Sequence, residues 1–371
     1  MTSSAFQAAL DAHDVTIPPE LIAREPASPR DSAGLVVLDR ATGETTWTVV
    51  SPIGGFLPPR AVLVLNETRV IPARLTLTRA TGGRVRALWT ATEDEGIRGM
   101  ADRRLKPGER LETADGDAFS VAAQDGRFWL LRPEFPVEEL RDVLERCGTM
   151  PLPPYIKESP LSERKLREEY QAVFAREEGS VAAPTASLHF TPELLAALEA
   201  SGTRIAKVTL HVHLGTFAPL TERQWESGRL HAESYRVPPE TASLLESAKA
   251  AGDPIVAVGT TALRTLESAA DDRGKIVRPE GETTLFIREG YAFRMVSALV
   301  TNFHVPRSSL LMLAGAFGGR ERVLEVYREA VARKWRFFLF GGGELVPRRR
   351  GESAGAPAKK TLGGAAPPRP G

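Results

Sequence analysis

The stretch of residues 179–220 limits the fold most, because a helical pattern changes there to a strand pattern within a few residues. Thr191 offers a side-chain oxygen as a helix N-cap, Pro192 suits the first helical position, and the helix should stop near Gly202. From Lys207 the sequence VTLHVHLGTF alternates apolar and polar residues, as a strand with one buried face does. This stretch therefore predicts a capped helix followed by a buried strand.

The predicted strand also brings histidines together. Alternation places Thr209, His211 and His213 on one face, opposite a face made of Val208, Leu210, Val212 and Leu214. Five of the six histidines of the chain lie between His189 and His304. A strand histidine is often only a core or edge residue with satisfied hydrogen bonds. Here the clustering, next to a loop of small residues, favours a functional site.

Two later segments repeat a strand–turn–helix pattern. In PIVAVGTTALRTLESAA, free N–H groups and the helix dipole should meet at Thr260 and Thr261. In SALVTNFHVPRSSLLMLAGAFGG, a strand and a polar turn precede a helix capped near Ser308. Such helix starts suit a carboxylate or phosphate, although many are only well capped. The sequence ERVLEVYREAVARKWRFFLFGGGELV then predicts a helix, a strand and a triple glycine.

The pattern is different between residues 75 and 147. Short β-like runs such as RVRALWTA, FSVAAQ and RFWLLRP alternate with turn signals, and VEELRDVLERCG should form a short amphipathic helix. The sequence therefore predicts a mixed α/β main domain with an inserted antiparallel β-barrel. The expected division is a main domain of residues 1–74 and 151–346, a barrel of residues 75–150 and a disordered tail of residues 347–371.

Charge and cysteine content exclude several classes of protein. The chain has 48 Lys and Arg against 47 Asp and Glu, so any contact with RNA must use a local basic patch. The single cysteine, Cys147, excludes an internal disulfide framework and a cysteine-rich zinc site. No stretch approaches the length of a membrane span, and the N-terminus lacks a signal-peptide pattern. We therefore expect a cytoplasmic protein without membrane contact.

Polar residues at other strand ends are further candidates. The run AVLVLNETRVIPARL ends in four candidate binding residues, Asn66, Thr68, Arg69 and Arg74. Binding groups of α/β proteins often follow a strand in this way, but an ordinary solvated loop has the same pattern. The run ESGRLHAESYR places His231 two residues before Glu233. Either residue could act as an acid or base, and a hydrogen-bonded surface pair is the alternative.

Seven segments, taken in order, resemble the motifs of one enzyme family. They are NETRVIPARL, MPLPPYI, EGSVAAPTASLHFT, VTLHVHLGTFAPL, GTTALRTLES, GYAFRMVSALVTNFHVPRSSLLML and WRFFLFG. Over residues 17–346 the chain is similar to the S-adenosylmethionine:tRNA ribosyltransferase-isomerase family of queuosine biosynthesis. Collinear motifs in this number leave little room for chance similarity.

The resemblance implies both a fold and a reaction. Members of the family have a mixed α/β main domain that carries an inserted β-barrel. They transfer and isomerise the ribosyl moiety of S-adenosylmethionine onto 7-aminomethyl-7-deazaguanine in the tRNA anticodon loop, which forms epoxyqueuosine and releases adenine and methionine. For this chain the expected partners are therefore S-adenosylmethionine, as a substrate without any further cofactor, and a tRNA anticodon loop. We expect the chain to act as a monomer.

This reaction needs a base, because the sulfonium acidifies the neighbouring ribose CH₂ and a proton must leave it in a site closed to water. The catalytic candidates in the matching motifs are His189, His211, His231 and His304. S-adenosylmethionine should bind between the loop 181–185 and the turn 259–261, where a helix start and an arginine suit its carboxylate. The substrate-binding candidates are Asn66, Thr68, Arg69, Arg74, Ala183, Pro184, Thr185, Gly215, Thr216, Glu233, Gly259, Thr260, Thr261, Arg264 and Asn302.

Several residues depart from the family pattern. The departures are Ser187, His213, Ala218, Ser297 and Gly342, where Gly, Gly, Arg, Asp and Asp are usual. They leave an alternative open, a diverged paralogue that binds or uses S-adenosylmethionine with a different acceptor. The added ring at His213 would fill space that a glycine leaves open. A zinc hydrolase built on His211 and His213 is the weakest hypothesis, because a third ligand is not visible, and no metal site is expected.

Overall fold

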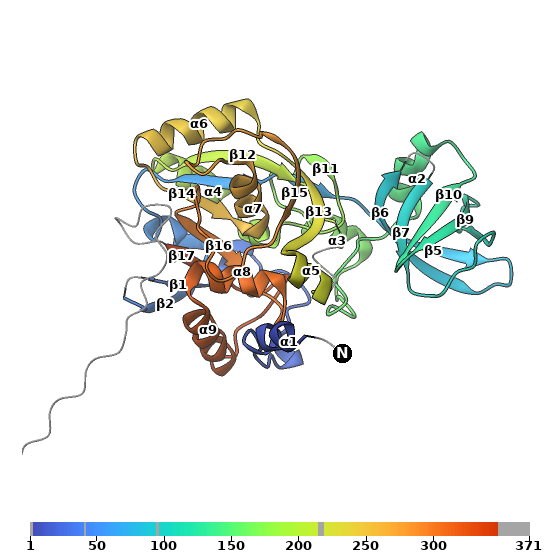
Figure 1. Ribbon diagram of the computed structural model, residues 1–371, viewed down its shortest axis with the longest axis horizontal. Coiled ribbons are helices and arrows are strands. Elements are labelled where there is room, and N and C mark those ends of the chain that lie inside the picture. The colour runs from blue at the N-terminus through green and yellow to red at the C-terminus, as the bar shows by residue number, and fades with distance from the viewer. Residues whose placement is uncertain (1–2, 41, 94–95, 214–218, 348–371) are drawn as a thin grey trace, which may run out of the picture.

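A computed structural model describes residues 3–40, 42–93, 96–213 and 219–347 of the chain. Its main body contains a nine-stranded mixed sheet, and a closed β-barrel stands to one side of that body (Figure 1). The predicted fold class, a mixed α/β main domain with an inserted antiparallel β-barrel, is confirmed. Of the predicted disordered tail, residues 348–371 lie outside the described residues.

Buried parallel strands form the centre of the large sheet. Its spatial order is β15 (Glu280–Leu285), β13 (Arg229–Arg236), β12 (Arg204–Leu210), β3 (Val62–Asn66), β14 (Ile255–Val258), β16 (Ala298–Asn302), β17 (Gly343–Pro347), β1 (Gly34–Leu38) and β2 (Thr45–Val49). The strands from β12 to β16 run parallel to one another. β3 and β14 are buried along their whole length, which explains their continuous apolar runs.

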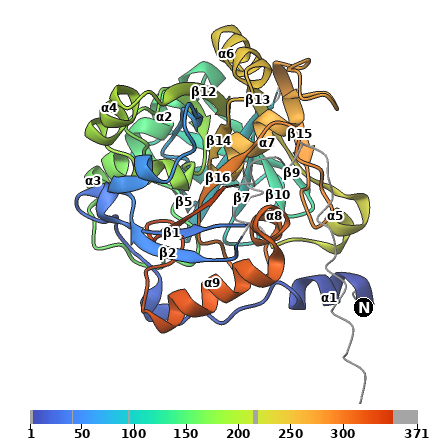
Figure 2. The same ribbon diagram turned by 90° about the vertical axis from the view of Figure 1, so that its left-hand side faces the viewer.

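Helices cover both faces of this sheet (Figure 2). One face packs against α6 (Pro239–Ala250), α7 (Gly259–Ala269), α8 (Ser309–Gly318) and α9 (Arg320–Ala332), and the other against α4 (Pro192–Ala200). The Thr191 side chain caps α4 by accepting a hydrogen bond from the backbone N–H of Leu194. Ser308 caps α8 in the same way through Leu311. Both predicted caps are confirmed.

The inserted segment closes into a barrel. Its antiparallel strands follow the order β10 (Phe128–Pro133), β7 (Gly96–Ala101), β6 (Arg84–Glu93), β5 (Arg74–Arg79), β8 (Arg110–Glu112) and β9 (Ala118–Asp125). Leu77, Val85 and Phe119 are fully buried in its core, against which α2 (Leu140–Cys147) packs as its amphipathic pattern predicted. Closure pairs every strand edge. The exact domain boundaries stay a prediction.

The two segments that join barrel and body run side by side. The backbone N–H of Arg74 donates to the carbonyl oxygen of Thr149 at 3.1 Å. In return, the N–H of Thr149 donates to the carbonyl oxygen of Arg74 at 2.8 Å. Close to this junction β4 (Thr68–Val70) pairs in parallel with β11 (Glu177–Ser180). The remaining helices are α1 (Ser4–Asp11), α3 (Glu163–Glu169) and α5 (Glu222–Ser227).

The strand predicted to carry His211 and His213 is shorter than expected, because β12 ends at Leu210. Beyond this point the N–H of His211 still donates to the carbonyl oxygen of Ser234 in β13 at 3.0 Å, but the carbonyl oxygen of Val212 accepts a hydrogen bond from the N–H of Val181, which lies outside any strand. The two histidines therefore lie in an irregular segment.

The strand predicted before the triple glycine is wrong. The strand β17 begins instead at the last of the three glycines, and the residues before it form a turn in which the N–H of Gly341 donates to the carbonyl oxygen of Phe338 at 3.0 Å. A Cβ atom on Gly341 would lie 2.4 Å from the backbone of Phe337, and one on Gly342 would lie 2.8 Å from the carbonyl oxygen of Gly34. These two positions have no room for a side chain, which accounts for the glycine at position 342.

Glu344 is a carboxylic acid in the middle of the sheet. It is 2% exposed, and neither carboxyl oxygen has a hydrogen-bond partner among the described residues. It faces Thr301 across the β16–β17 ladder. Tyr327 of α9 is near, since burial and this carboxyl group together raise the pKa of the phenol. Burial raises the pKa of Glu344 to about 8, so the group is mostly protonated at neutral pH.

We expect Glu344 to make the fold less stable as the pH rises from its ordinary pKa of 4.5 to about 8. In this window the unfolded chain has released the proton and the folded chain retains it, so each pH unit favours unfolding by about 1.4 kcal/mol. Glu344→Met should remove this pH dependence. It should stabilise the protein most near pH 8, the upper end of this window. Urea denaturation at several pH values measures the effect, and equal pH dependence in both proteins would contradict it.

Candidate functional site

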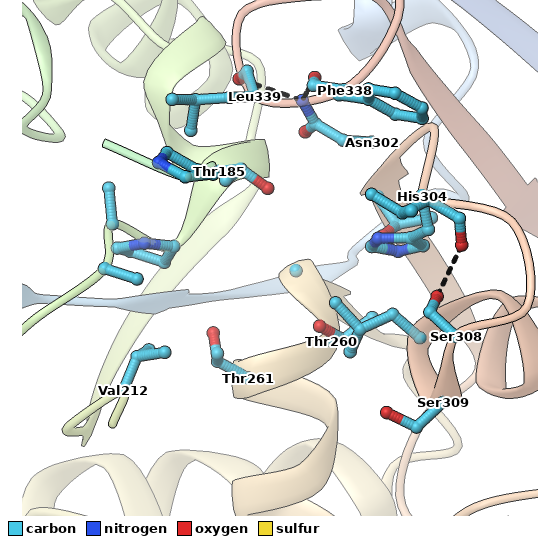
Figure 3. A pocket seen from close by; sticks show the side chains of 18 of the residues that line it. Thr185, Val212, Thr260, Thr261, Asn302, His304, Ser308, Ser309, Phe338 and Leu339 are labelled. Atoms are coloured by element: carbon cyan, nitrogen blue, oxygen red, sulfur yellow. Dashed lines mark hydrogen bonds between the residues drawn. The ribbon is translucent and has the colours of Figure 1, made fainter. Parts of the chain in front are cut away.

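A pocket opens at the carboxyl ends of the central strands, where β14 passes into α7 and β16 passes into the loop before α8 (Figure 3). Open α/β sheets bind ligands at this edge, because loops and helix starts converge there. The sequence-predicted residues that line it are Ala183, Pro184, Thr185, His231, Glu233, Gly259, Thr260, Thr261, Arg264, Asn302 and His304. The structure thus gathers residues from four separate segments of the chain.

The start of α7 presents donors to this pocket. Gly259 has a φ of +89°, and no side chain caps the helix at Val258. The Oγ1 atom of Thr261 is buried without a hydrogen-bond partner among the described residues. Figure 3 shows Thr260 and Thr261 at this end of the helix. Free N–H groups and the positive end of the helix dipole favour an anion here.

Arg264 adds a buried cation beside the helix start. Its Nη1 donates to a carboxylate oxygen of Glu233, and its Nε donates to the carbonyl oxygen of Leu285 at 3.1 Å. Arg264 is 6% exposed and Glu233 3% exposed. The Nη2 of Arg264 is buried without a partner in the described part of the chain. One guanidinium nitrogen is therefore available to a ligand while the others hold the arginine in place.

Asn302 closes the opposite side of the pocket. Its side-chain amide donates to the carbonyl oxygens of Phe338 and Leu339, at 2.9 and 3.3 Å (Figure 3). The donors are thereby committed to the loop before β17, and the side-chain oxygen is left to act as an acceptor.

Two buried histidines lie near Asn302. The Nε2 of His304 is 2.8 Å from the Oγ1 of Thr301, and its ring lines the pocket. His189 is buried but does not line the pocket. Burial lowers the pKa of each imidazole to about 4, and the Asn302 side chain offsets part of this effect for His189. Both rings are therefore neutral at pH 7 and able to accept a proton.

His231 lies at the rim of the pocket, half-buried on β13. Its Nε2 is 3.4 Å from the Nη2 of Arg127, which belongs to the barrel. Burial and, after it, the charge of Arg127 lower the pKa of His231, while Glu233 acts in the opposite direction. The barrel thus reaches the pocket through this arginine.

A second polar cluster lies outside the pocket. The Oγ1 of Thr68 is 2.9 Å from the Nδ1 of His211 and 2.7 Å from the Oγ of Ser180. Asn66 is bonded through its amide to both backbone groups of Leu210. Burial is the main cause of a lowered pKa at His211. These contacts hold the end of β11 against the end of β12.

The other predicted residues are dispersed. Arg69 pairs with Glu178 on the surface, and Arg74 donates to the carbonyl oxygen of Leu152 at 2.8 Å. The predicted residues Gly215 and Thr216, like Ala218, lie outside the described residues. His213 does not line the pocket, whereas its neighbour Val212 does, so the expected filling of substrate space by this ring is not observed.

Sequence reasoning missed a group of lining residues that are apolar or aromatic, apart from Gln224. They are Pro153, Tyr155, Tyr170, Val212, Leu220, Gln224, Leu230, Phe338 and Leu339. Tyr155 lies in the proline-rich MPLPPYI segment and Phe338 has a φ of +67°. A positive φ outside glycine often accompanies a functional loop, but it cannot be read from a sequence.

The described ranges offer neither a metal site nor a membrane span. They contain no group of three or more His, Cys, Asp or Glu residues that could hold a metal ion. The zinc-hydrolase hypothesis therefore gains no third ligand from them. None of the described helices has both the length and the apolar character needed to cross a membrane.

Known proteins resemble this chain over most of its length. The family model described as "Queuosine biosynthesis protein" matches residues 10–346. The S-adenosylmethionine:tRNA ribosyltransferase-isomerase of Trichlorobacter lovleyi is 44% identical, covering 90% of this chain and 98% of its own length. The enzyme of the same name from Rubrobacter xylanophilus is 46% identical, covering 91% of this chain and 97% of its own length. The crystal structure of the S-adenosylmethionine tRNA ribosyltransferase of Thermotoga maritima has a TM-score of 0.51 and 33% identity, covering 90% of this chain and 99% of that one.

The pair of Arg264 and Glu233 allows a direct test of the geometry. Glu233→Gln should destabilise the protein by about 3–5 kcal/mol, because it leaves a buried guanidinium without its counter-charge. Combining it with Arg264→Met should cost less than the sum of the two single changes. Urea denaturation of the four proteins gives the coupling energy. Additive effects would mean that the two groups do not interact.

Proposed function

Because the chain belongs to the S-adenosylmethionine:tRNA ribosyltransferase-isomerase family of queuosine biosynthesis proteins, we propose that its pocket is the site of that reaction. The pocket would hold S-adenosylmethionine while the ribosyl moiety is transferred to 7-aminomethyl-7-deazaguanine in a tRNA anticodon loop and isomerised. The product is epoxyqueuosine, and adenine and methionine leave. The observation that carries this proposal is the set of unpartnered donors at the start of α7.

The methionine carboxylate of S-adenosylmethionine fits these donors. The backbone N–H groups at Thr260 and Thr261 and the free Nη2 of Arg264 all favour a carboxylate. Ala182 and Ala183 also line the pocket and have little bulk, so a ligand can approach the backbone closely. Asn302 offers its oxygen as an acceptor on the other side of the pocket.

A neutral imidazole is a suitable base for the first step. The sulfonium acidifies the adjacent ribose CH₂, and the base takes a proton from that carbon. His304 and His231 line the pocket, and His189 and His211 lie farther back. The first two are therefore the stronger candidates for direct proton transfer. The latter two fit positioning roles better.

A diverged paralogue with another acceptor is the second candidate. The departures at Ser187, His213, Ser297 and Gly342 motivate it, but none of these four residues lines the pocket. Gly342 has no room for a side chain beside Gly34 and Trp335. These four departures thus lie outside the pocket lining, which favours the family reaction, and the fifth, Ala218, is outside the described residues. We further propose that the protein works in the cytoplasm as a monomer.

The proposal is tested by turnover and by binding. The purified protein should release adenine and methionine from S-adenosylmethionine when it is given an anticodon stem-loop that contains 7-aminomethyl-7-deazaguanine. Turnover only with a different acceptor would support the paralogue. In calorimetry, Thr261→Val should weaken S-adenosylmethionine binding by about tenfold or more, because a hydrogen bond to a charged group is lost. Thr265→Val is the matched control, since Thr265 bonds the carbonyl oxygen of Thr261 and does not line the pocket.

The pH profile identifies the class of base. The pKa of each of the four candidate histidines is lowered from 6.5, and for His189 and His304 it falls to about 4. The acidic limb of kcat/KM should therefore lie below pH 6.5, since activity is lost only when the base is protonated. A limb near pH 4 would favour a fully buried ring. An apparent pKa at or above 6.5 would exclude all four candidates as they stand in this structure.

A further inference from the structure

The barrel carries a cluster of two guanidinium groups on one aromatic ring, Arg98, Arg127 and Phe128, here called the Phe128 cluster. The guanidinium carbon of Arg98 lies 4.3 Å from the ring centroid, and that of Arg127 lies 5.5 Å from it. Arg98 is also paired with Asp125 at 2.6 Å. Arg127 is exposed, and no carboxylate pairs with it among the described residues. The cluster therefore presents one uncompensated positive charge, which the ring helps to position.

This charge lies at the edge of the proposed active site. The Nη2 of Arg127 is 3.4 Å from the Nε2 of His231, and His231 lines the pocket. Arg127 comes from the turn between β9 and β10, whereas His231 comes from β13 of the main body. The Phe128 cluster is thus a barrel surface that borders the mouth of a pocket formed by the main body.

A tRNA base that reacts inside a pocket must be turned out of its loop. The phosphates on either side of it then remain at the pocket mouth, because they are joined to the base through the sugar. Single-stranded RNA is commonly held by arginine contacts to these phosphates and by rings beside them. The chain as a whole has almost balanced charge, so such contacts must come from local groups of this kind.

We propose that Arg127 binds a backbone phosphate next to the modified nucleotide of the anticodon loop, with Phe128 holding the guanidinium in place. This inference rests on the proposed function, since it takes the RNA substrate from it. It assigns to the barrel a role in positioning the acceptor at the pocket. The partner is recognised by its phosphodiester charge, so Arg127 contributes affinity in preference to sequence specificity.

The test is the salt dependence of RNA binding, measured without S-adenosylmethionine so that chemistry does not enter. A labelled anticodon stem-loop is titrated with the wild-type protein and with Arg127→Gln between about 50 and 200 mM salt. We expect Arg127→Gln to weaken binding by about three- to tenfold and to reduce the slope of log K against log salt by about 0.7, the value for one single-strand phosphate. Arg127→Lys, which retains the charge, should keep most of the slope.

Arg84→Gln is the matched control, because Arg84 is an exposed arginine of the same barrel that makes none of these contacts. It should leave affinity and slope unchanged. If Arg127→Gln and Arg84→Gln had the same affinity and the same salt slope, the inference would be overturned. Turnover of the stem-loop by the wild-type protein would still support the proposed function in that case. Conversely, the wild-type protein could bind the stem-loop through Arg127 and yet never release adenine. This result would support the phosphate-binding role of Arg127 and count against the proposed reaction.

Discussion

Burial of parallel strands on both faces is the constraint on which this structure depends. Each parallel neighbour requires a crossover that returns to the same end of the sheet, so β14 and β16 both end at one edge and their helices both begin there. That edge collects the start of α7, Asn302 and the loop of residues 181–185 although they lie far apart in the sequence. The buried contact between Arg264 and Glu233 in turn ties α7 to β13 and fixes one wall of the pocket.

The parts of the fold that local chemistry controls could be predicted from the sequence. The N-caps at Thr191 and Ser308 and the start of the helix after Val258 follow from residue types within one helical turn. The barrel was visible from the spacing of its turns. The end of β12 was not, because it is set by a hydrogen bond between Val181 and Val212 that joins segments distant in the chain.

The candidate site was predictable to the same extent. Thr261 and Arg264 were found because they lie on one short helix with a recognisable start. His211 was expected in the same site on the basis of strand alternation, but the strand ends before it, and its ring bonds Thr68 outside the pocket. Tyr155 and Phe338 were missed because only the tertiary fold brings their segments to this edge. The protonation of Glu344 could not be predicted, since the neighbours of a buried acid decide its pKa.

The paired backbones of Arg74 and Thr149 have a consequence for how the chain folds. They join the two ends of the inserted segment, so for the main body the whole barrel is equivalent to one closed loop between Arg74 and Thr149. The entropy lost in closing a loop rises only with the logarithm of its length, by about 0.6 kcal/mol for each doubling. Insertions and deletions within the barrel therefore change this term little. Barrels of different size could therefore be joined to the same large sheet at a similar entropic cost.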